Sequence, residues 1–80
     1  MRMMDEVIDL EGLGIALLCV AGAPRNGMRI RDARGNVHTV ADVTEQEGMY
    51  TLYLPDGDAA YFGRLFRDVR VDATLFEEAE

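Results

Sequence analysis

The stretch that decides the fold runs from residue 28 to residue 54 and reads MRIRDARGNVHTVADVTEQEGMYTLYL. At 28–31, apolar residues alternate with arginines, which is the period-two pattern of a strand with one buried face. A polar turn around Gly35 leads into residues 37–43, which are rich in the β-branched residues that favour strands. A second polar turn leads into residues 49–54, where the alternation resumes. The stretch therefore predicts three antiparallel strands joined by tight turns.

The most apolar segment of the chain lies before this stretch, at residues 13–21. Apolar side chains would occupy both faces of a strand here, and a short buried helix over the same residues has the same pattern. Because Gly12 and Gly14 disfavour a helix that begins early, we predict a strand over 14–21, with the helix as the alternative. Residues 1–12 are acidic, and we expect them to form a partly ordered segment with a frayed end.

The chain after this stretch begins with a strong turn signal at residues 55–57, Pro-Asp-Gly. Residues 58–68 then fit two patterns. As a strand, they would place Tyr61, Gly63 and Leu65 on one face and Phe62, Arg64 and Phe66 on the other. Their apolar residues also recur at helical spacing, in a helix that Asp58 could cap. Gly63 inside the element and the preceding turn favour a returning strand. We therefore predict a strand over 58–68, with the helix as the alternative.

The last part of the chain completes the predicted fold. Alternation at 69–75 predicts a final strand, and the acidic residues at 77–80 are expected to form a solvated tail. The predicted fold class is mainly β, a small single-domain antiparallel barrel or meander of four or five short strands covering residues 1–80. It has room for one short helix, at 13–21 or at 58–68.

At the level of architecture, residues 27–75 resemble an SH3-like barrel of the Tudor or KOW type. The features that carry the resemblance are Gly27-Met-Arg-Ile-Arg-Asp, the turn Arg34-Gly-Asn, and Tyr50-Thr-Leu-Tyr-Leu-Pro-Asp-Gly. In Tudor-like barrels, aromatic side chains on adjacent strands can form a cage for a methylated cation. The resemblance implies that Asp56 or Asp58 would supply the negative charge of such a cage.

The composition excludes several kinds of chemistry. The chain has 80 residues, a formal net charge of −7, one Cys and one His, and it contains no Ser, Lys or Trp. These absences exclude serine-hydrolase, Schiff-base and Walker A chemistry, an intrachain disulfide framework and a Cys/His zinc site. The acidic balance disfavours a nucleic-acid partner, because a polyphosphate would be repelled. We therefore predict no catalytic residue, no metal, no cofactor and no enzymatic activity.

Residues 15–23 are apolar and end in small residues, as the core of a signal peptide does. The segment before them carries four acidic residues and a single arginine, whereas a signal peptide needs a positively charged start. The apolar run is also too short for the roughly 20 residues that span a membrane. We therefore predict a cytoplasmic chain without a membrane partner, in a compartment whose reducing conditions suit a lone thiol.

The candidate binding residues are two arginines and the three tyrosines, Arg29, Arg31, Tyr50, Tyr53 and Tyr61. The arginines project to one face of the predicted strand, where two guanidinium groups could hold a phosphate or a carboxylate. The alternative is that they pair with acidic residues of a neighbouring strand, at Asp42, Glu45 or Glu47. The tyrosines could line a small-ligand site, but a small domain without Trp also needs its aromatic residues in the core.

The function that the sequence predicts is that of a non-enzymatic interaction module, which acts through a protein partner or as a homo-oligomer. His38 and Cys19 are not expected to act together, because a thiol in the most apolar segment would be buried and inert. We predict a homodimer in which the strand within 13–21, or its exposed edge, pairs with a second copy. The alternatives are a small-ligand or anion-binding domain that uses the five candidate residues, and an acidic decoy of a nucleic-acid enzyme, as small phage and mobile-element proteins can be.

Overall fold

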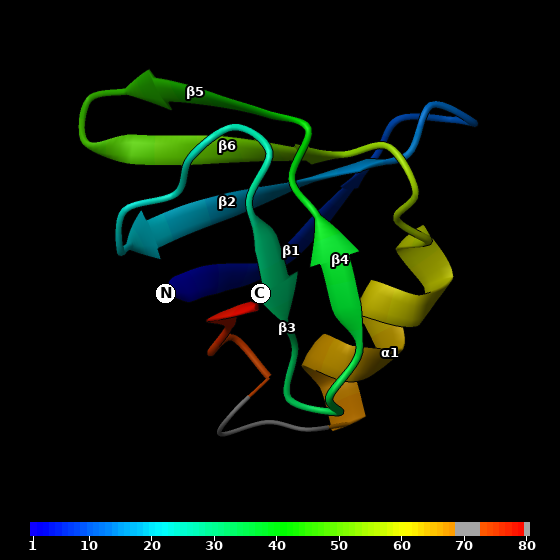
Figure 1. Ribbon diagram of the computed structural model, residues 1–80. Coiled ribbons are helices and arrows are strands. Elements are labelled where there is room, and N and C mark those ends of the chain that lie inside the picture. The colour runs from blue at the N-terminus through cyan, green and yellow to red at the C-terminus, as the bar shows by residue number, and fades with distance from the viewer. Residues whose placement is uncertain (69–72, 80) are drawn as a thin grey trace.

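The structure is a computed structural model that describes residues 1–68 and 73–79. Within these residues the fold is mainly β, as predicted, and contains one helix (Figure 1). The elements in chain order are β1 (Arg2–Asp9), β2 (Ile15–Ala21), β3 (Arg29–Arg31), β4 (Val37–Thr39), β5 (Asp42–Gln46), β6 (Met49–Leu54), α1 (Ala59–Asp68) and β7 (Glu77–Ala79). The strands form two antiparallel sheets, one of four strands in the order β1-β2-β6-β5 and one of three in the order β4-β3-β7.

β2 lies inside the four-stranded sheet, between β1 and β6. Its alternate residues Ile15, Leu17 and Cys19 are fully buried in the core. The strand predicted over 14–21 is confirmed and the helix over 13–21 is wrong, because the backbone of the segment pairs with a neighbour on each side. Because both edges of β2 are already paired, a second copy cannot pair with either of them. The prediction of a homodimer through an exposed edge of this strand is therefore wrong.

The strand predicted over 37–43 is divided between the two sheets. β4 pairs with β3, as the predicted hairpin requires, and β5 pairs with β6. At the junction the Val40 amide donates to the Met28 carbonyl at 2.9 Å, and the next amide, of Ala41, donates to the Tyr53 carbonyl at 2.9 Å. The chain therefore passes from the three-stranded to the four-stranded sheet within two residues. The sequence of 37–43 favours a strand throughout, so it gives no sign of this change of sheet.

The N-terminal segment is a regular element rather than the partly ordered one that its acidity suggested. Met3 is fully buried, and β1 pairs with β2 through a register shift between Met3 and Val7. Arg2 forms an isolated bridge with Leu75, and the Met3 amide donates to the Thr74 carbonyl at 2.7 Å. The start of β1 therefore contacts the C-terminal segment, so the two sheets also meet on this side.

The C-terminal segment departs from the prediction as well. Residues 77–79, predicted as part of a solvated tail, form β7, which pairs with β3. The side chains of Glu77 and Glu78 are exposed as predicted, but the backbone completes a sheet, and Glu78 forms an ion pair with Arg25. In the strand predicted over 69–75, residues 69–72 lie outside the described residues, and Ala73 and Thr74 form a turn.

Residues 58–68, predicted as a strand, form the helix α1. The Asp58 side chain caps its first turn, accepting a hydrogen bond from the Ala60 amide at 3.0 Å. One helix face buries Phe62, Leu65 and Phe66 in the core, while Gly63 lies on the exposed face. The prediction was wrong because a glycine on an exposed helix face costs only about 1 kcal/mol, which burial of two phenylalanines and a leucine easily exceeds.

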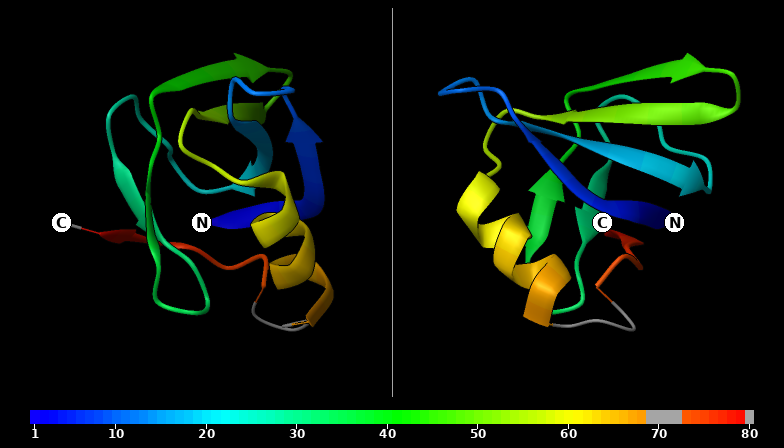
Figure 2. Two further views of the ribbon diagram at one scale, coloured as in Figure 1. Left: turned by 90° about the vertical axis from the view of Figure 1, so that its right-hand side faces the viewer. Right: turned by 180° about the vertical axis from the view of Figure 1, so that it is seen from behind.

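The core lies between the four-stranded sheet and the layer formed by α1 and the three-stranded sheet. Both views in Figure 2 show the four-stranded sheet across the top of the molecule, with α1 and the smaller sheet beneath it. Phe62 from α1, Leu52 from β6 and Ile30 from β3 are all fully buried between these layers. The helix therefore holds its aromatic residues against the β3–β4 hairpin, which positions the polar cluster described next.

Candidate functional site

A buried carboxylate, Asp32, lies at the centre of the most densely bonded polar cluster in the described residues. It follows β3, and only 4% of its surface is exposed. Its Oδ1 accepts hydrogen bonds from the backbone amides of Arg34 at 2.8 Å and Asn36 at 3.1 Å. This is the local pattern by which an aspartate closes a turn, with Gly35 supplying a positive φ of 87°. One carboxylate oxygen therefore shapes the β3–β4 turn.

The second oxygen of Asp32 joins this turn to the helix. The Tyr61 hydroxyl donates to Oδ2 at 2.6 Å, and His38 Nε2 lies 2.7 Å from the same atom. The Tyr61 hydroxyl accepts in turn from the Asn36 side-chain amide at 2.7 Å. Every buried side-chain polar atom within residues 1–68 and 73–79 has a hydrogen-bond partner. The cluster is thus fully satisfied, the condition under which a buried polar network rigidifies its surroundings.

The cluster sets the charge state of its members. Burial by itself would raise the pKa of Asp32, but the hydrogen bonds from His38, Tyr61 and the backbone amides of Arg34 and Asn36 outweigh it and lower this pKa below its ordinary value. Burial and the bond to the Asp32 carboxylate raise the pKa of the Tyr61 hydroxyl. Asp32 is therefore an ionised acceptor and Tyr61 a neutral donor, so Nε2 of His38 carries the hydrogen that faces Asp32.

The rings of the cluster pack against one another. The His38 ring lies 4.7 Å from the Phe62 ring centre, and the Tyr61 ring meets Phe62 edge-on at 5.3 Å. The Arg34 guanidinium carbon lies 6.0 Å from the centre of the Tyr61 ring. The hydroxyl of Tyr61 is thus bonded to Asp32 while its ring is held among neighbours, which fixes the side chain at both ends.

A hollow of about 310 Å³ opens beside these rings. We call it the His38 hollow, and it is lined by Asn36, His38, Asp56, Asp58, Tyr61 and Phe62. A smaller hollow of about 130 Å³ adjoins it and shares His38 and Asp56. The lining combines aromatic rings with two exposed carboxylates and includes no arginine. Such a lining suits a cation and opposes an anion.

The structure does not gather the five predicted binding residues. Tyr61 alone lines the His38 hollow. Tyr50 and Tyr53 lie on β6 facing opposite sides of the sheet: Tyr50 packs against the core, and the Tyr53 hydroxyl donates to the Leu13 carbonyl at 2.7 Å. A single site that uses all three tyrosines, as the ligand-binding alternative supposed, is not formed.

The two arginines lie on β3, in the other sheet. Arg29 is opposite Thr39 on β4 and Ala79 on β7, and Arg31 is opposite Val37 and Glu77. Their strand neighbours therefore do not include Asp42, Glu45 or Glu47, which belong to β5 and the turn after it. Arg31 does have an acidic residue opposite it, but this residue is Glu77 of β7, in the segment that was predicted to be a tail.

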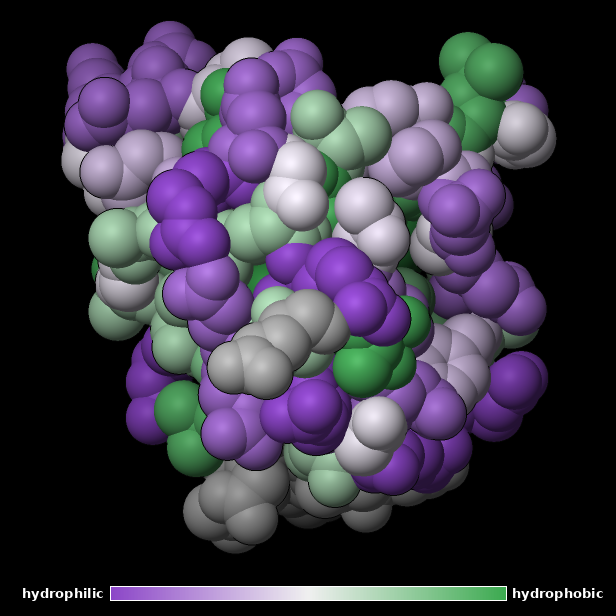
Figure 3. Space-filling view, in the orientation of Figure 1, coloured by the Kyte–Doolittle hydropathy of each residue, from purple (hydrophilic) through white to green (hydrophobic). Residues whose placement is uncertain are grey.

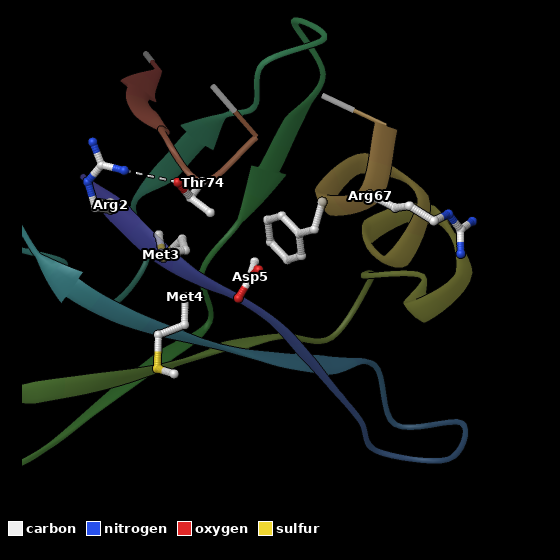
Figure 4. Close-up of a pocket in the computed structure, with 7 residues that line it drawn as sticks. Arg2, Met3, Met4, Asp5, Arg67 and Thr74 are labelled. Carbon is white, nitrogen blue, oxygen red and sulfur yellow. Dashed lines mark hydrogen bonds between the residues drawn. The ribbon is translucent and has the colours of Figure 1, made fainter. Parts of the chain in front are cut away.

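A larger hollow of about 530 Å³ lies where β1 meets the end of α1 (Figure 4). Arg2 donates to the Thr74 hydroxyl at 3.2 Å at one end of it, and Arg67 lies on the far side of the helix. Met4 points away from Thr74. Because these side chains do not converge on a common point, this hollow offers no matched set of groups to a ligand.

Within residues 1–68 and 73–79, no group of three or more His, Cys, Asp or Glu side chains is arranged to hold a metal ion. The same residues include no helix with the length and the apolar character that a membrane span needs. No family model, curated protein or solved structure matches the chain, so its function must be inferred from its own residues.

Proposed function

We propose that the protein is a non-enzymatic interaction module that receives a cationic side chain of a partner protein in the His38 hollow. The observation that carries the proposal is the lining of this hollow, in which Asp56 and Asp58 occur together with the rings of His38 and Tyr61. No arginine lines the hollow, although the Arg34 guanidinium carbon lies 6.0 Å from the Tyr61 ring centre. A cation above an aromatic ring gains about 0.5–1 kcal/mol at an exposed site. Each exposed carboxylate adds up to about 1 kcal/mol.

The charge of the whole chain supports the same partner. A net charge of −7 attracts a basic segment and speeds its encounter with the acidic surface. Residues that could serve as nucleophiles do not support an enzyme: Cys19 is buried in the core, and burial raises the pKa of its thiol. The SH3-like barrel and the cytoplasmic location remain part of this proposal; the contacts that join the two sheets at Ala41 and Leu75 favour such a barrel.

The test is an NMR titration of the ¹⁵N-labelled protein with N-acetyl-arginine amide, N-acetyl-lysine amide and a short arginine-rich peptide. We expect amide shifts centred on residues 36–38 and 56–62. The expected affinity is about millimolar for the single amino acids and tighter for the peptide. The two amino-acid probes also separate guanidinium from ammonium recognition.

Two double variants of equal charge test whether the hollow matters. Asp56→Asn with Asp58→Asn removes both carboxylates, and asparagine at 58 still caps α1. Glu45→Gln with Glu47→Gln removes the same two charges from the β5–β6 hairpin. We expect the first pair to weaken peptide binding about tenfold, or about 1.4 kcal/mol, and the second about twofold. Equal weakening by the two pairs, or shifts remote from the hollow, would contradict the proposal.

A further inference from the structure

The outer face of the four-stranded sheet, which points away from α1 and the smaller sheet, is apolar along its two central strands. On β2 and β6, the residues that alternate with the buried core residues are Ala16, Leu18, Val20, Met49, Thr51 and Tyr53. Ala16 pairs with Tyr53 and Leu18 with Thr51, so these side chains form cross-strand rows. The row of Ala16 and Tyr53 continues onto β1 at Ile8 and onto the edge strand β5 at Asp42. The residues of the two central strands are uncharged, and Asp42 brings a carboxylate to the edge of the face.

The side chains of this face differ in exposure: Ala16 is buried, and Leu18, Thr51 and Tyr53 are half-buried. Val20 is 43% exposed, Ile8 38% and Met49 37%, and Leu13 in the adjoining turn is 69% exposed. These four make up most of the six large apolar side chains that are exposed within residues 1–68 and 73–79. By contrast, the face with β3 and β4 in front is mostly polar, with apolar residues in small separate groups (Figure 3).

We propose that this outer face is the contact surface of a homodimer, in which the central strands of one copy pack on those of a second copy. The face has the uncharged centre that a self-complementary two-fold contact needs, because each residue near the axis meets its own kind. Sheets commonly pack face to face in this way, with an uncharged layer about 10 Å thick between them. A basic partner would find no carboxylate at the centre of the face.

Two copies could instead pair edge to edge through β5, but the acidic residues along this edge disfavour that contact. β5 carries Asp42 and Glu45, and Glu47 follows it, so two copies of this edge would bring like charges together. The Val43 amide is also already bonded, since it donates to the Asn26 side chain at 2.8 Å.

The size of the face sets the strength of the dimer. With the two outer strands included, four strands at about 4.8 Å spacing and six residues at about 3.3 Å rise cover at most about 400 Å² per copy. This is about half of the roughly 800 Å² that each partner buries in a stable interface. We therefore expect a weak, reversible dimer with a dissociation constant in the range of about 10–100 µM.

The test is sedimentation equilibrium from about 5 µM to about 500 µM protein, at low and high salt. The mass should rise with concentration from the 8.9 kDa of the monomer toward twice that value. Higher salt should strengthen the dimer, because it screens repulsion between two chains that each carry −7. A constant monomer mass at every concentration and both salt levels would overturn the proposal.

Matched variants locate the contact. Val20→Glu places a charge on the outer face, while Val37→Glu places the same charge on a valine of similar exposure in β4. We expect Val20→Glu to weaken association at least tenfold and Val37→Glu to leave it nearly unchanged; equal effects would refute the assignment. If Val20→Glu fails to fold, as judged by its melting curve, Met49→Glu provides the same test from β6.

This inference and the proposed function fail separately. The outer face and the His38 hollow share no residue, so a monomeric Val20→Glu chain should still bind the arginine-rich peptide at the hollow. Their salt dependences are also opposite. Binding of a basic peptide weakens as salt rises, whereas self-association of an acidic chain strengthens.

Discussion

Replacing Asp32 with alanine should destabilise the fold more than any other single change to a charged residue in the described part of the chain. The Asp32 side chain is fully buried, and its two oxygens accept from the backbone of the β3–β4 turn and from the side chains of Tyr61 and His38. Alanine removes all four acceptor contacts. It also leaves the Tyr61 hydroxyl and His38 Nε2 facing a small void.

The magnitude follows from the donors left without a partner. A buried donor that loses its acceptor costs about 1–3 kcal/mol, and two side-chain donors and two turn amides are affected here. Because Tyr61 and Asn36 lie close enough to the surface to recover water, we expect a net loss of about 3 kcal/mol. A chain of 80 residues has a total stability of about 4–12 kcal/mol, so the loss is a large fraction of the whole.

Thermal unfolding followed by circular dichroism measures this loss. For a domain of this size, about 3 kcal/mol corresponds to a fall in Tm of about 12–24 °C. Tyr61→Phe removes one of the hydrogen bonds to Asp32 and should cost about 1 kcal/mol. In the double variant, the loss of stability should be smaller than the sum of the two single losses, because both substitutions remove the same hydrogen bond between Tyr61 and Asp32.

The control is Asp42→Ala, which removes an exposed aspartate from β5 and should change stability by no more than about 0.5 kcal/mol. The reasoning is refuted if Asp32→Ala lowers Tm by less than about 4 °C, or if the Asp32 and Tyr61 losses are fully additive. Either result would mean that the cluster does not act as one bonded unit in solution.

Three further predictions concern pH and backbone conformation. Because the pKa of Asp32 is lowered in the folded state, the unfolded chain takes up this proton first as the pH falls. The stabilisation by this carboxylate is complete above about pH 4 and is lost as the pH falls through the folded pKa. Denaturant unfolding should therefore show a larger acid-side loss in the wild type than in Asp32→Asn. Gly14→Ala should lower the free energy of unfolding by at least about 2 kcal/mol in the same assay, since Gly14 has a φ of 97° and a methyl group there would overlap the Leu54 carbonyl oxygen. The control is Gly35→Ala, which should lower it by only about 1 kcal/mol, because Gly35 has a φ of 87° but open space around it. Gly63→Ala should raise stability by about 0.5–1 kcal/mol, because a methyl group on this exposed helix position meets no other atom; a decrease would show that α1 is not the stable form of this segment.

The parts of the fold that the sequence predicted are those in which local pattern and tertiary environment agree. Alternation with one buried face predicted the strands within 28–31 and 49–54, and continuous apolar character predicted the buried β2. Tertiary structure decided the remaining elements. Residues 58–68 satisfy both periods, and the choice of helix depends on the core that Phe62 and Phe66 enter.

The candidate site shows the same limit more sharply. In the sequence, Asp32 is simply the first residue of the polar turn around Gly35, and its contacts with the backbone of Arg34 and Asn36 agree with that role. Its bond to Tyr61 joins residues 29 positions apart, and only the docking of α1 on the β3–β4 hairpin creates it. A short polar residue between two strands carries no sequence signal that distinguishes an exposed turn aspartate from a buried one.

The two ends of the Tyr61 side chain have different roles, because the hydroxyl belongs to the buried cluster and the ring lines the His38 hollow. The hydroxyl is already engaged, donating to Asp32 and accepting from Asn36, so it offers a ligand little further hydrogen bonding. The ring remains at the His38 hollow, together with Asp56 and Asp58, which belong to the turn before α1. A partner cation would therefore meet a ring that the buried cluster holds in place, and it would share this ring with the Arg34 guanidinium, whose carbon lies 6.0 Å from the ring centre. The cost of ordering this ring is met when the chain folds, which lowers the entropic cost of binding.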